Sequence, residues 1–299
     1  MNQALTKAVS EEAMGKSEHV MKPGLHLVAT PIGHLGDLSP RALETLKDAD
    51  LVICEDSRVT GKLLKLNGVE RSLLPYHEHN AARMRPRILD HLARGECVAL
   101  ASDAGTPSVS DPGYKLVRAV IDAGHEVMVV PGPSAALAAL VVSGLPTDRF
   151  LFGGFLPSRA AARRKAIEEL SGVPATLIWF ESAKRLSAAL EDLADILGPR
   201  PAAVARELTK TFEEVRRGSL AELASAFGQG KPPRGEIVIV IGAPTAARGA
   251  VGDEAIDQAL HEALLTMSPS AAAASVAKKA DLPRRELYRR ALALREGAV

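Results

Sequence analysis

Residues 97–113 read Cys-Val-Ala-Leu-Ala-Ser-Asp-Ala-Gly-Thr-Pro-Ser-Val-Ser-Asp-Pro-Gly, an apolar run that ends abruptly in small and acidic residues. The run predicts a buried β-strand, and the segment after it predicts an exposed loop whose backbone a ligand can approach at Gly105. Two more apolar runs end in such loops, at 30–37 and 131–135. An ordinary turn between a strand and a helix explains one loop of this kind. Three in one half of the chain indicate a shared small-molecule site.

Length and composition limit the number of domains and the classes of partner that the chain can have. A chain of 299 residues exceeds what one hydrophobic core usually serves, so we expect two domains. The 37 Lys and Arg residues are balanced by 36 Asp and Glu residues, so net charge does not attract the protein to nucleic acid or membrane. Any binding of a polyanion must depend on local clusters of basic residues. Cys54 and Cys97 lie in apolar runs without ligand spacing, so we expect buried thiols in a reducing, cytoplasmic location. No stretch is long enough for a membrane span, and residues 1–21 predict a mobile polar leader.

Between residues 22 and 144, short apolar runs alternate with helical patterns. This alternation predicts an α/β domain whose parallel sheet is covered on both faces. The expected strands are 25–29, 51–54, 98–101 and 127–130, and the expected helices are 40–48, 81–94, 114–123 and 135–142.

A linker-like stretch at 144–148 leads into a second expected α/β domain, residues 145–245. Its expected strands are 150–153, 176–180, 202–205 and 236–241, and its expected helices are 160–170, 183–197 and 221–227.

Residues 246–299 predict a small unit like a helix-turn-helix, with a helix start at 268–270 and a short turn at 281–283. The last helix carries five arginines, which fit either a basic face for RNA or an ordinary solvated helix. These are Arg284, Arg285, Arg289, Arg290 and Arg295.

The loops lack the glycine patterns of phosphate-binding sites. The pattern Gly-x-x-x-x-Gly-Lys-Ser/Thr is absent, and Gly33 and Gly36 in the first loop do not form Gly-x-Gly-x-x-Gly. Glu55 and Asp56 would suit the ribose of an ordinary Rossmann methyltransferase, but without the glycine-rich turn this carries little weight. A cofactor without phosphates, such as S-adenosylmethionine, fits better, because its adenine and ribose take backbone hydrogen bonds in a partly apolar slot.

Six segments together resemble the ribosomal RNA small-subunit methyltransferases of the tetrapyrrole-methylase fold. They are VATPIGHLGD at 28–37, CEDSR at 54–58, SDAGTPSVSDPG at 102–113, PGPSA at 131–135, RELTK at 206–210 and RGE at 234–236. The resemblance spans about residues 23–244 in order, and the C-terminal unit resembles the helix-turn-helix of many family members. Ser57 and His34 depart from the pattern, in which Thr and Asn are common.

The resemblance implies two α/β domains with S-adenosylmethionine in the cleft between them. It implies methyl transfer to the ribose 2′-oxygen of a cytidine in the decoding centre of 16S ribosomal RNA, on the small ribosomal subunit, by a homodimer. The implied cofactor contacts are Pro31, Ala104, Gly105, Thr106, Ser134, Ala135, Glu181, Ser182 and Leu208.

A ribose hydroxyl reacts only once its proton leaves, so we expect a base or a cation that stabilises the alkoxide. The candidate catalytic residues are Asp103, Glu207 and Lys210. For Asp103, a carboxylate that caps a turn is the commoner explanation. Glu207 and Lys210 are alternatively a surface ion pair.

The candidate RNA contacts lie at loops or helix starts: Arg58, Lys62, Lys184 and Arg185, with further basic clusters at 83–87 and 159–165. A solvated surface is the commoner explanation for any one cluster. Because aromatic residues make up only 3% of the chain, base stacking cannot be the main means of RNA capture, which favours recognition by shape. His77 and His79 have no partners at ligand spacing, so we expect no metal site.

Two other functions stay open. Tetrapyrrole-ring and diphthine-type methyltransferases share the fold, but they generally carry Gly-Asp-Pro where this chain has Gly-Thr-Pro at 105–107. A nucleic-acid-binding regulator would use the helix-turn-helix as its working part, with the α/β region as a ligand sensor.

Overall fold

The computed structural model describes residues 21–110, 113–229, 232–244, 253–280 and 284–295. The expected leader, apart from Met21, and the expected turn at 281–283 lie outside these residues. Contacts divide the chain into two compact units, Met1–Ala139 with Arg206–Glu214, and Leu140–Ala205 with Val215–Val299. The segment Arg206–Glu214 thus groups with the first unit, although its sequence falls within the second α/β domain.

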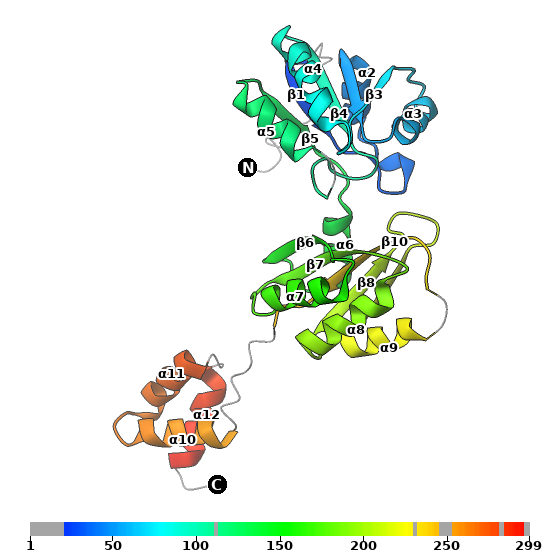
Figure 1. The fold of residues 1–299 in the computed structure, drawn as a ribbon. Helices are drawn as coiled ribbons and strands as arrows, with labels where there is room; N and C mark the ends of the chain where they lie inside the picture. Colours follow the sequence, from blue (N-terminus) through cyan, green and yellow to red (C-terminus); the bar gives the residue numbers. More distant parts are fainter. Residues whose placement is uncertain (1–20, 111–112, 230–231, 245–252, 281–283, 296–299) are drawn as a thin grey trace, which may run out of the picture. The chain divides into compact units, whose positions relative to one another are not determined.

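The first unit contains a five-stranded parallel sheet in the order β3-β2-β4-β1-β5 (Figure 1), as the alternating pattern predicts. Its elements are β1 (Gly24–Val28), η1 (Leu35–Asp37), α2 (Pro40–Asp48), β2 (Leu51–Cys54), α3 (Ser57–Leu66), β3 (Leu73–Pro75), α4 (Ala81–Ala93), β4 (Cys97–Ala101), α5 (Tyr114–Asp122), β5 (Val127–Val130) and α6 (Ala135–Ser143). The sequence does not predict α3 and β3. The strand is three residues long, and the helix carries β-branched residues and a glycine in its first two turns, which lower helix propensity.

Helices cover both faces of this sheet because the apolar side chains along each strand point alternately to one face and to the other. One face packs Leu25, Ile53 and Leu100 against α4 and α5, and the other packs Val52 and Ala99 against α2 and α3. Cys54 and Cys97 are buried free thiols, as expected, and burial raises the pKa of Cys54 to about 11.

The strand order creates a point at which the chain leaves two neighbouring strands in opposite directions. Strands β1 and β4 pair in register, Leu27 beside Leu100, yet β1 leads toward β2 on one side and β4 leads toward β5 on the other. Open parallel sheets bind ligands outside the carboxyl ends of the strands at such a point. The loops after β1 and β4 therefore occupy the place where the architecture favours a site.

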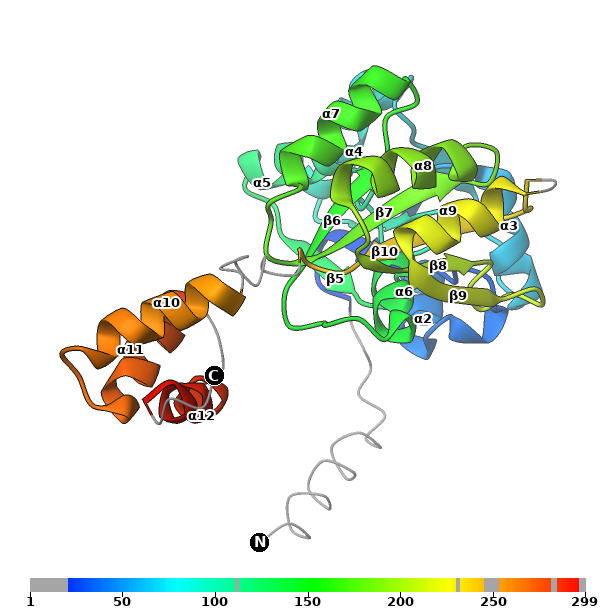
Figure 2. The same ribbon diagram turned by 90° about the horizontal axis from the view of Figure 1, so that it is seen from below.

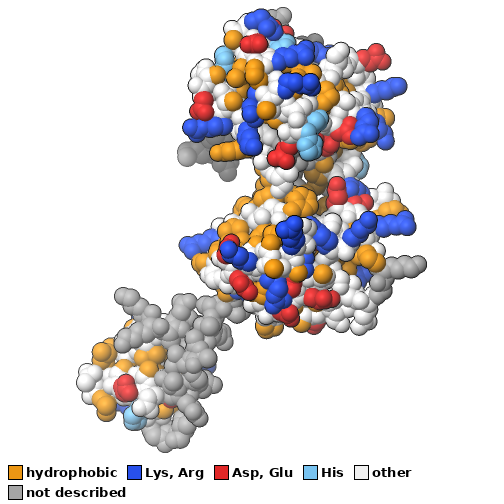
Figure 3. Space-filling view, viewed as in Figure 1, with side chains coloured by type: hydrophobic (Ala, Val, Ile, Leu, Met, Phe, Trp, Pro, Cys, Tyr) orange, Lys and Arg blue, Asp and Glu red, His pale blue; other side chains and the backbone are white. Residues whose placement is uncertain are grey.

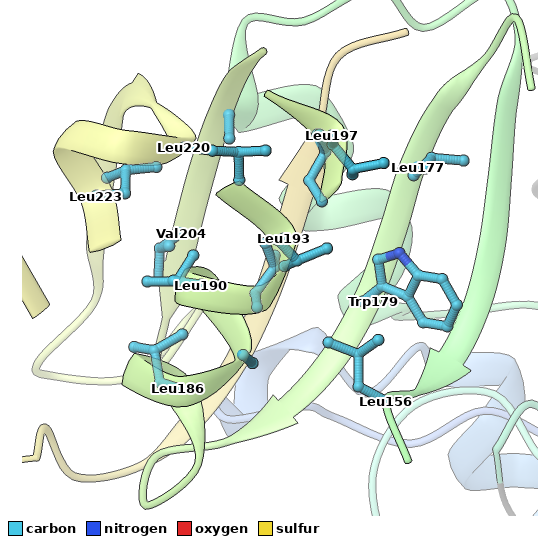
Figure 4. Packing of buried hydrophobic residues seen from close by; sticks show 14 of the residues in the cluster. Leu156, Leu177, Trp179, Leu186, Leu190, Leu193, Leu197, Val204, Leu220 and Leu223 are labelled. Atoms are coloured by element: carbon cyan, nitrogen blue, oxygen red, sulfur yellow. The ribbon is translucent and has the colours of Figure 1, made fainter. Parts of the chain in front are cut away.

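The second unit holds a five-stranded sheet in the order β6-β7-β10-β8-β9, in which β6 is parallel and β10 antiparallel to β7. Its elements are β6 (Phe150–Phe155), α7 (Ala160–Leu170), β7 (Thr176–Ser182), α8 (Leu186–Leu197), β8 (Pro201–Arg206), β9 (Glu214–Ser219), α9 (Leu220–Gly228) and β10 (Glu236–Ile241). The sequence does not predict β9, whose Glu-Val-Arg-Arg-Gly-Ser has little strand character. Figure 4 shows the main core of this unit, in which the leucines of α8 and α9 pack on Leu177, Trp179 and Val204 of the sheet.

Three C-terminal helices, α10 (Asp253–Leu264), α11 (Pro269–Ala280) and α12 (Arg284–Arg295), form a bundle of their own (Figure 2). Ile256, Val276 and Leu287, one from each helix, meet in its core. Of the expected basic face, Arg290 turns to Asp257 of α10 at 2.6 Å, because a half-buried guanidinium needs an acceptor. No described helix combines the length and the apolar character needed to span a membrane.

Candidate functional site

The loops after β1 and β4 are joined by a short antiparallel bridge. Thr30 and Gly105 exchange two backbone hydrogen bonds, 2.9 Å from Thr30 N to Gly105 O and 3.0 Å in the other direction. The buried Thr30 hydroxyl donates to the Ser102 carbonyl at 3.0 Å, and the Ser102 hydroxyl donates to the Gly105 carbonyl at 2.6 Å. Gly105 is thereby held at a φ of 84°, a conformation that favours glycine.

The third loop joins through Thr106, whose hydroxyl donates to the Pro133 carbonyl at 3.2 Å. Ser134 directly precedes α6, and its carbonyl accepts the Ala138 amide at 2.9 Å. The structure thus links the three loops that carry the predicted cofactor contacts Pro31, 104–106 and 134–135.

The loop after β4 presents free backbone donors. Ala104 is exposed and Thr106 half-buried, and within the described part of the chain neither backbone N–H donates a hydrogen bond. A Cβ on Gly105 would come no closer than 3.4 Å to its nearest neighbour, so positive φ rather than crowding makes glycine the favoured residue there. The loop can therefore offer backbone donors to a polar ligand.

The segment Arg206–Glu214 is tightly braced. Lys210 Nζ lies 2.8 Å from Glu207 Oε1, and Arg206 Nη2 lies 3.0 Å from Glu214 Oε2. Glu207 and Thr209 have φ values of 50° and 63°, which are rare for residues other than glycine. Such backbone strain concentrates at functional sites.

This segment packs on the loop after β1. A Cβ on Gly33 would lie 2.5 Å from Lys210 Cγ, 2.6 Å from Thr209 Oγ1 and 3.0 Å from the Leu208 carbonyl oxygen, so only glycine fits. The His34 amide donates to Thr209 Oγ1 at 3.1 Å, and Leu208 is buried. The candidate catalytic pair Glu207 and Lys210 is thus fixed to the first of the three loops.

A cluster of carboxylates lies at the carboxyl ends of β2 and β4. Asp103 Oδ1 accepts the Asp56 amide at 3.0 Å, which fits the expectation of a turn-capping carboxylate. Burial raises the pKa of Asp103, and burial together with the Asp103 charge raises the pKa of Glu55. Hydrogen bonds from Arg58 lower the pKa of Asp56 to about 2. Asp103 is therefore both a capping group and a stronger base than an ordinary aspartate.

In the second unit, Glu181 at the end of β7 has a fully buried side chain. Its Oε1 accepts the Ser182 amide at 2.6 Å and Arg185 Nη2 at 2.6 Å. Its Oε2 is buried without a partner among the described residues, which leaves an acceptor available to a ligand. Ser182 and Lys184 are exposed.

Several predicted basic clusters are neutralised. The exposed Arg58 pairs with Asp56 at 2.5 Å. Arg163, predicted to lie on a solvated or RNA-binding surface, is buried against Asp192 at 2.7 Å, which overturns that prediction for this residue. Lys62 on α3 stays exposed. Figure 3 shows basic, acidic and apolar side chains interspersed on the visible face, in line with the balanced charge.

Sequence reasoning missed the residues that assemble the loops, namely Thr30, Gly33, Ser102 and Thr209. Thr30 and Ser102 each follow an apolar strand closely, which is the one local signal that marks them. No group of three or more metal-ligating side chains occurs in the described ranges.

Comparisons with known proteins agree with this geometry. A family model described as Tetrapyrrole (Corrin/Porphyrin) Methylases matches residues 24–224, and one described as RsmI C-terminal HTH domain matches residues 250–295. The chain is 50% identical over 277 residues to the Ribosomal RNA small subunit methyltransferase I of Mesorhizobium japonicum, which covers 92% of this chain and 94% of that protein. The protein of the same name from Erythrobacter litoralis is 50% identical over 279 residues, which covers 93% and 98%.

Solved structures share the fold at lower identity. Diphthine synthase has a TM-score of 0.58 at 18% identity, covering 73% of this chain and 89% of that one. Uroporphyrin-III C-methyl transferase from Thermus thermophilus, complexed with S-adenyl homocysteine, has a TM-score of 0.50 at 23% identity, covering 73% and 97%. At these identities the likeness shows the fold alone.

Proposed function

Because the chain belongs to the tetrapyrrole methylase family, and within it to the ribosomal RNA small subunit methyltransferases I, we propose that it methylates the ribose 2′-oxygen of a cytidine in the decoding centre of 16S ribosomal RNA. The methyl donor is S-adenosylmethionine, and the substrate is the RNA of the small ribosomal subunit in the cytoplasm. The observation that supports the proposal is the 50% identity to two proteins named Ribosomal RNA small subunit methyltransferase I, over more than nine-tenths of both chains.

A sulfonium cofactor fits the residues present. The free N–H groups of Ala104 and Thr106 suit the acceptors of a nucleoside, and the unpartnered Oε2 of Glu181 suits an amine or hydroxyl donor. The proposed contacts are Pro31, Ala104, Gly105, Thr106, Ser134, Ala135, Glu181, Ser182 and Leu208. The cleft between the two domains stays a prediction.

When bound, the cofactor supplies an electrophilic methyl group on its sulfur. The chain's own task is to remove the ribose proton and hold the oxygen in line. We propose that the carboxylate of Asp103 or Glu207 accepts the proton of the ribose hydroxyl, and that Lys210 stabilises the developing alkoxide. The cofactor, held by the contacts named above, would give its methyl group to the ribose oxygen and would be left as a neutral thioether.

RNA contacts are local in this proposal. Lys62 and Lys184 are both exposed, and neither has an acidic partner among the described residues, so their charges are available to phosphates. Arg58 and Arg185 each keep one carboxylate partner and would bind phosphate only by sharing or exchanging it. RNA binding should therefore weaken with salt, but less steeply than for a strongly basic protein.

A homodimer is proposed from an exposed apolar helix. The sequence of α6 is apolar all round, a pattern typical of a buried helix, yet Leu137 is 49% and Val141 is 68% exposed. Phe150 and Phe155 on the edge strand β6 are also exposed. A second copy of the chain would cover these residues, and the molar mass in solution, measured by light scattering, tests this.

The function is tested by incubating the full chain with methyl-labelled S-adenosylmethionine and small ribosomal subunits that lack the modification. We expect label in 16S RNA, recovered after digestion as 2′-O-methylcytidine. Label on a base would overturn the ribose assignment, and label on a different RNA would overturn the assignment of 16S RNA as substrate. Label only in a tetrapyrrole or in diphthine precursor protein would establish the alternative activities that share the fold.

Two variants sharpen the assay. Asp103→Asn and Lys210→Met should lower kcat while cofactor affinity, measured by calorimetry, changes little. A chain truncated before residue 250 should still bind the cofactor, because the three C-terminal helices have their own core. Loss of cofactor binding on truncation would instead favour a regulator that works through these helices.

A further inference from the structure

Phe212 is an exposed aromatic side chain in a segment that is otherwise fixed. The residue is 72% exposed, although large apolar side chains are normally withdrawn from water. It lies two residues beyond Lys210, in the same segment as the candidate catalytic pair.

The backbone around Phe212 is held from both sides. The Thr209 amide donates to Glu213 Oε2 at 2.5 Å, and the Glu213 amide donates to the Lys210 carbonyl at 3.1 Å. The link from His34 to Thr209 ties the segment to the sheet of its unit. The ring is therefore presented to solvent by a rigid support, which lowers the entropy lost when a ligand covers it.

The size of this apolar surface matches a nucleobase better than a protein. A specific protein interface covers about 800 Å² per partner, whereas one aromatic side chain contributes about 150–250 Å². The immediate neighbours Thr211 and Glu213 are polar and exposed, so the ring is isolated. One isolated aromatic face is what a single unstacked base requires.

The position of Phe212 also suits the reaction. Two residues span at most about 7 Å, and stacked nucleotides are about 3.4 Å apart along a strand. A ribose presented to Lys210 therefore leaves its own base, or the adjacent one, within reach of the ring. A stacked base would fix the rotation of the nucleotide and so the direction from which its 2′-oxygen approaches.

From this arrangement we propose that Phe212 stacks on a base of single-stranded RNA at or next to the nucleotide that is methylated. The proposal rests on the function proposed above. It does not require many aromatic residues, because one ring orients the target while the rest of the RNA is recognised by shape and charge.

The test measures binding of the full chain to a short cytidine-containing RNA, once single-stranded and once annealed to its complement. Phe212→Leu keeps the apolar bulk but removes the ring, and Phe212→Trp restores one. We expect Phe212→Leu to weaken single-strand binding about 5- to 150-fold, the equivalent of about 1–3 kcal/mol for one stacked base, with Phe212→Trp near the wild type. Duplex binding and cofactor affinity should not change.

Tyr114→Leu, which replaces an equally exposed aromatic residue at the start of α5, is the matched control and should bind as the wild type does. Unchanged single-strand affinity of Phe212→Leu overturns the proposal, and so does a change in molar mass, which would make a second copy the occupant. If ribosomal RNA is methylated but binding does not depend on Phe212, only this inference fails. If binding depends on Phe212 but no RNA is methylated, the inference holds and the proposed reaction fails.

Discussion

Replacing Gly33 with alanine should disable catalysis by moving the segment that carries Glu207 and Lys210. The added Cβ would lie 2.5 Å from Lys210 Cγ, 2.6 Å from Thr209 Oγ1 and 3.0 Å from the Leu208 carbonyl oxygen. The lysine carbon can shift cheaply. Thr209 Oγ1 and the carbonyl cannot, because the first is held by the His34 amide and the second is backbone.

The size of the effect follows from these contacts. Overpacking costs about 1–3 kcal/mol, and the lost hydrogen bond costs about 1 kcal/mol. Alanine also lowers the conformational entropy of the unfolded chain, which stabilises the folded state and offsets about 0.4–1 kcal/mol of this cost. The net destabilisation is therefore about 1–3 kcal/mol, and a displacement of about 1 Å in the catalytic pair can lower kcat about a hundredfold.

The assay compares Gly33→Ala with Gly172→Ala. Gly172 lies between α7 and β7, a Cβ there would meet no atom within 4 Å, and its φ is not left-handed, so alanine should be neutral or slightly stabilising. Thermal unfolding and the rate of methyl transfer to small ribosomal subunits are measured for both. A Gly33→Ala variant with wild-type rate and unfolding temperature would refute the packing argument.

Three further changes test the rest of the site. Thr30→Val removes a buried hydroxyl that holds the loop after β4, so the free energy of unfolding should fall by about 1–2 kcal/mol and cofactor affinity should fall, as calorimetry will measure. Arg185→Leu leaves the carboxylate of Glu181 buried without its cation and should destabilise the chain by about 3 kcal/mol in denaturant unfolding, whereas Lys184→Leu, at the neighbouring position, should have little effect. The pKa of Asp103 is raised in the folded state, so its contribution favours folding at low pH and is lost as pH rises through that pKa. The unfolding free energy of the wild type, relative to that of Asp103→Asn, should therefore rise from pH 7 toward pH 4, and a difference that does not depend on pH would contradict the raised pKa.

The elements that the sequence predicts well are those with strong local signals. The helix α2 is predicted at its observed bounds, because Ser39 caps its first turn and Pro40 occupies its first position. The strands β2, β5 and β10 are also found at the predicted bounds, because their apolar runs are bounded by polar residues or turns. The edge strands β3 and β9 are missed, since β3 is only three residues long and β9 carries charged residues in place of an apolar run.

The site is harder to predict because its decisive contacts are distant in sequence. Motifs identify which loops belong to it, but the hydrogen bond from His34 to Thr209 joins residues 175 positions apart. No periodicity or spacing reports such a contact. The same holds for the buried Arg163, since a basic cluster on a helix gives no sign that Asp192, 29 positions later, will accept its charge.

The strained backbone at Glu207 and Thr209 connects these observations. Left-handed conformations at two residues other than glycine cost about 1–3 kcal/mol each, and a segment with no other task would relieve them by substitution to glycine. Here both side chains are occupied, Glu207 by Lys210 and Thr209 by the loop after β1. Glycine would relax the backbone but lose those contacts. The strain is therefore retained at the two positions whose side chains join the candidate catalytic pair to the loop beside it.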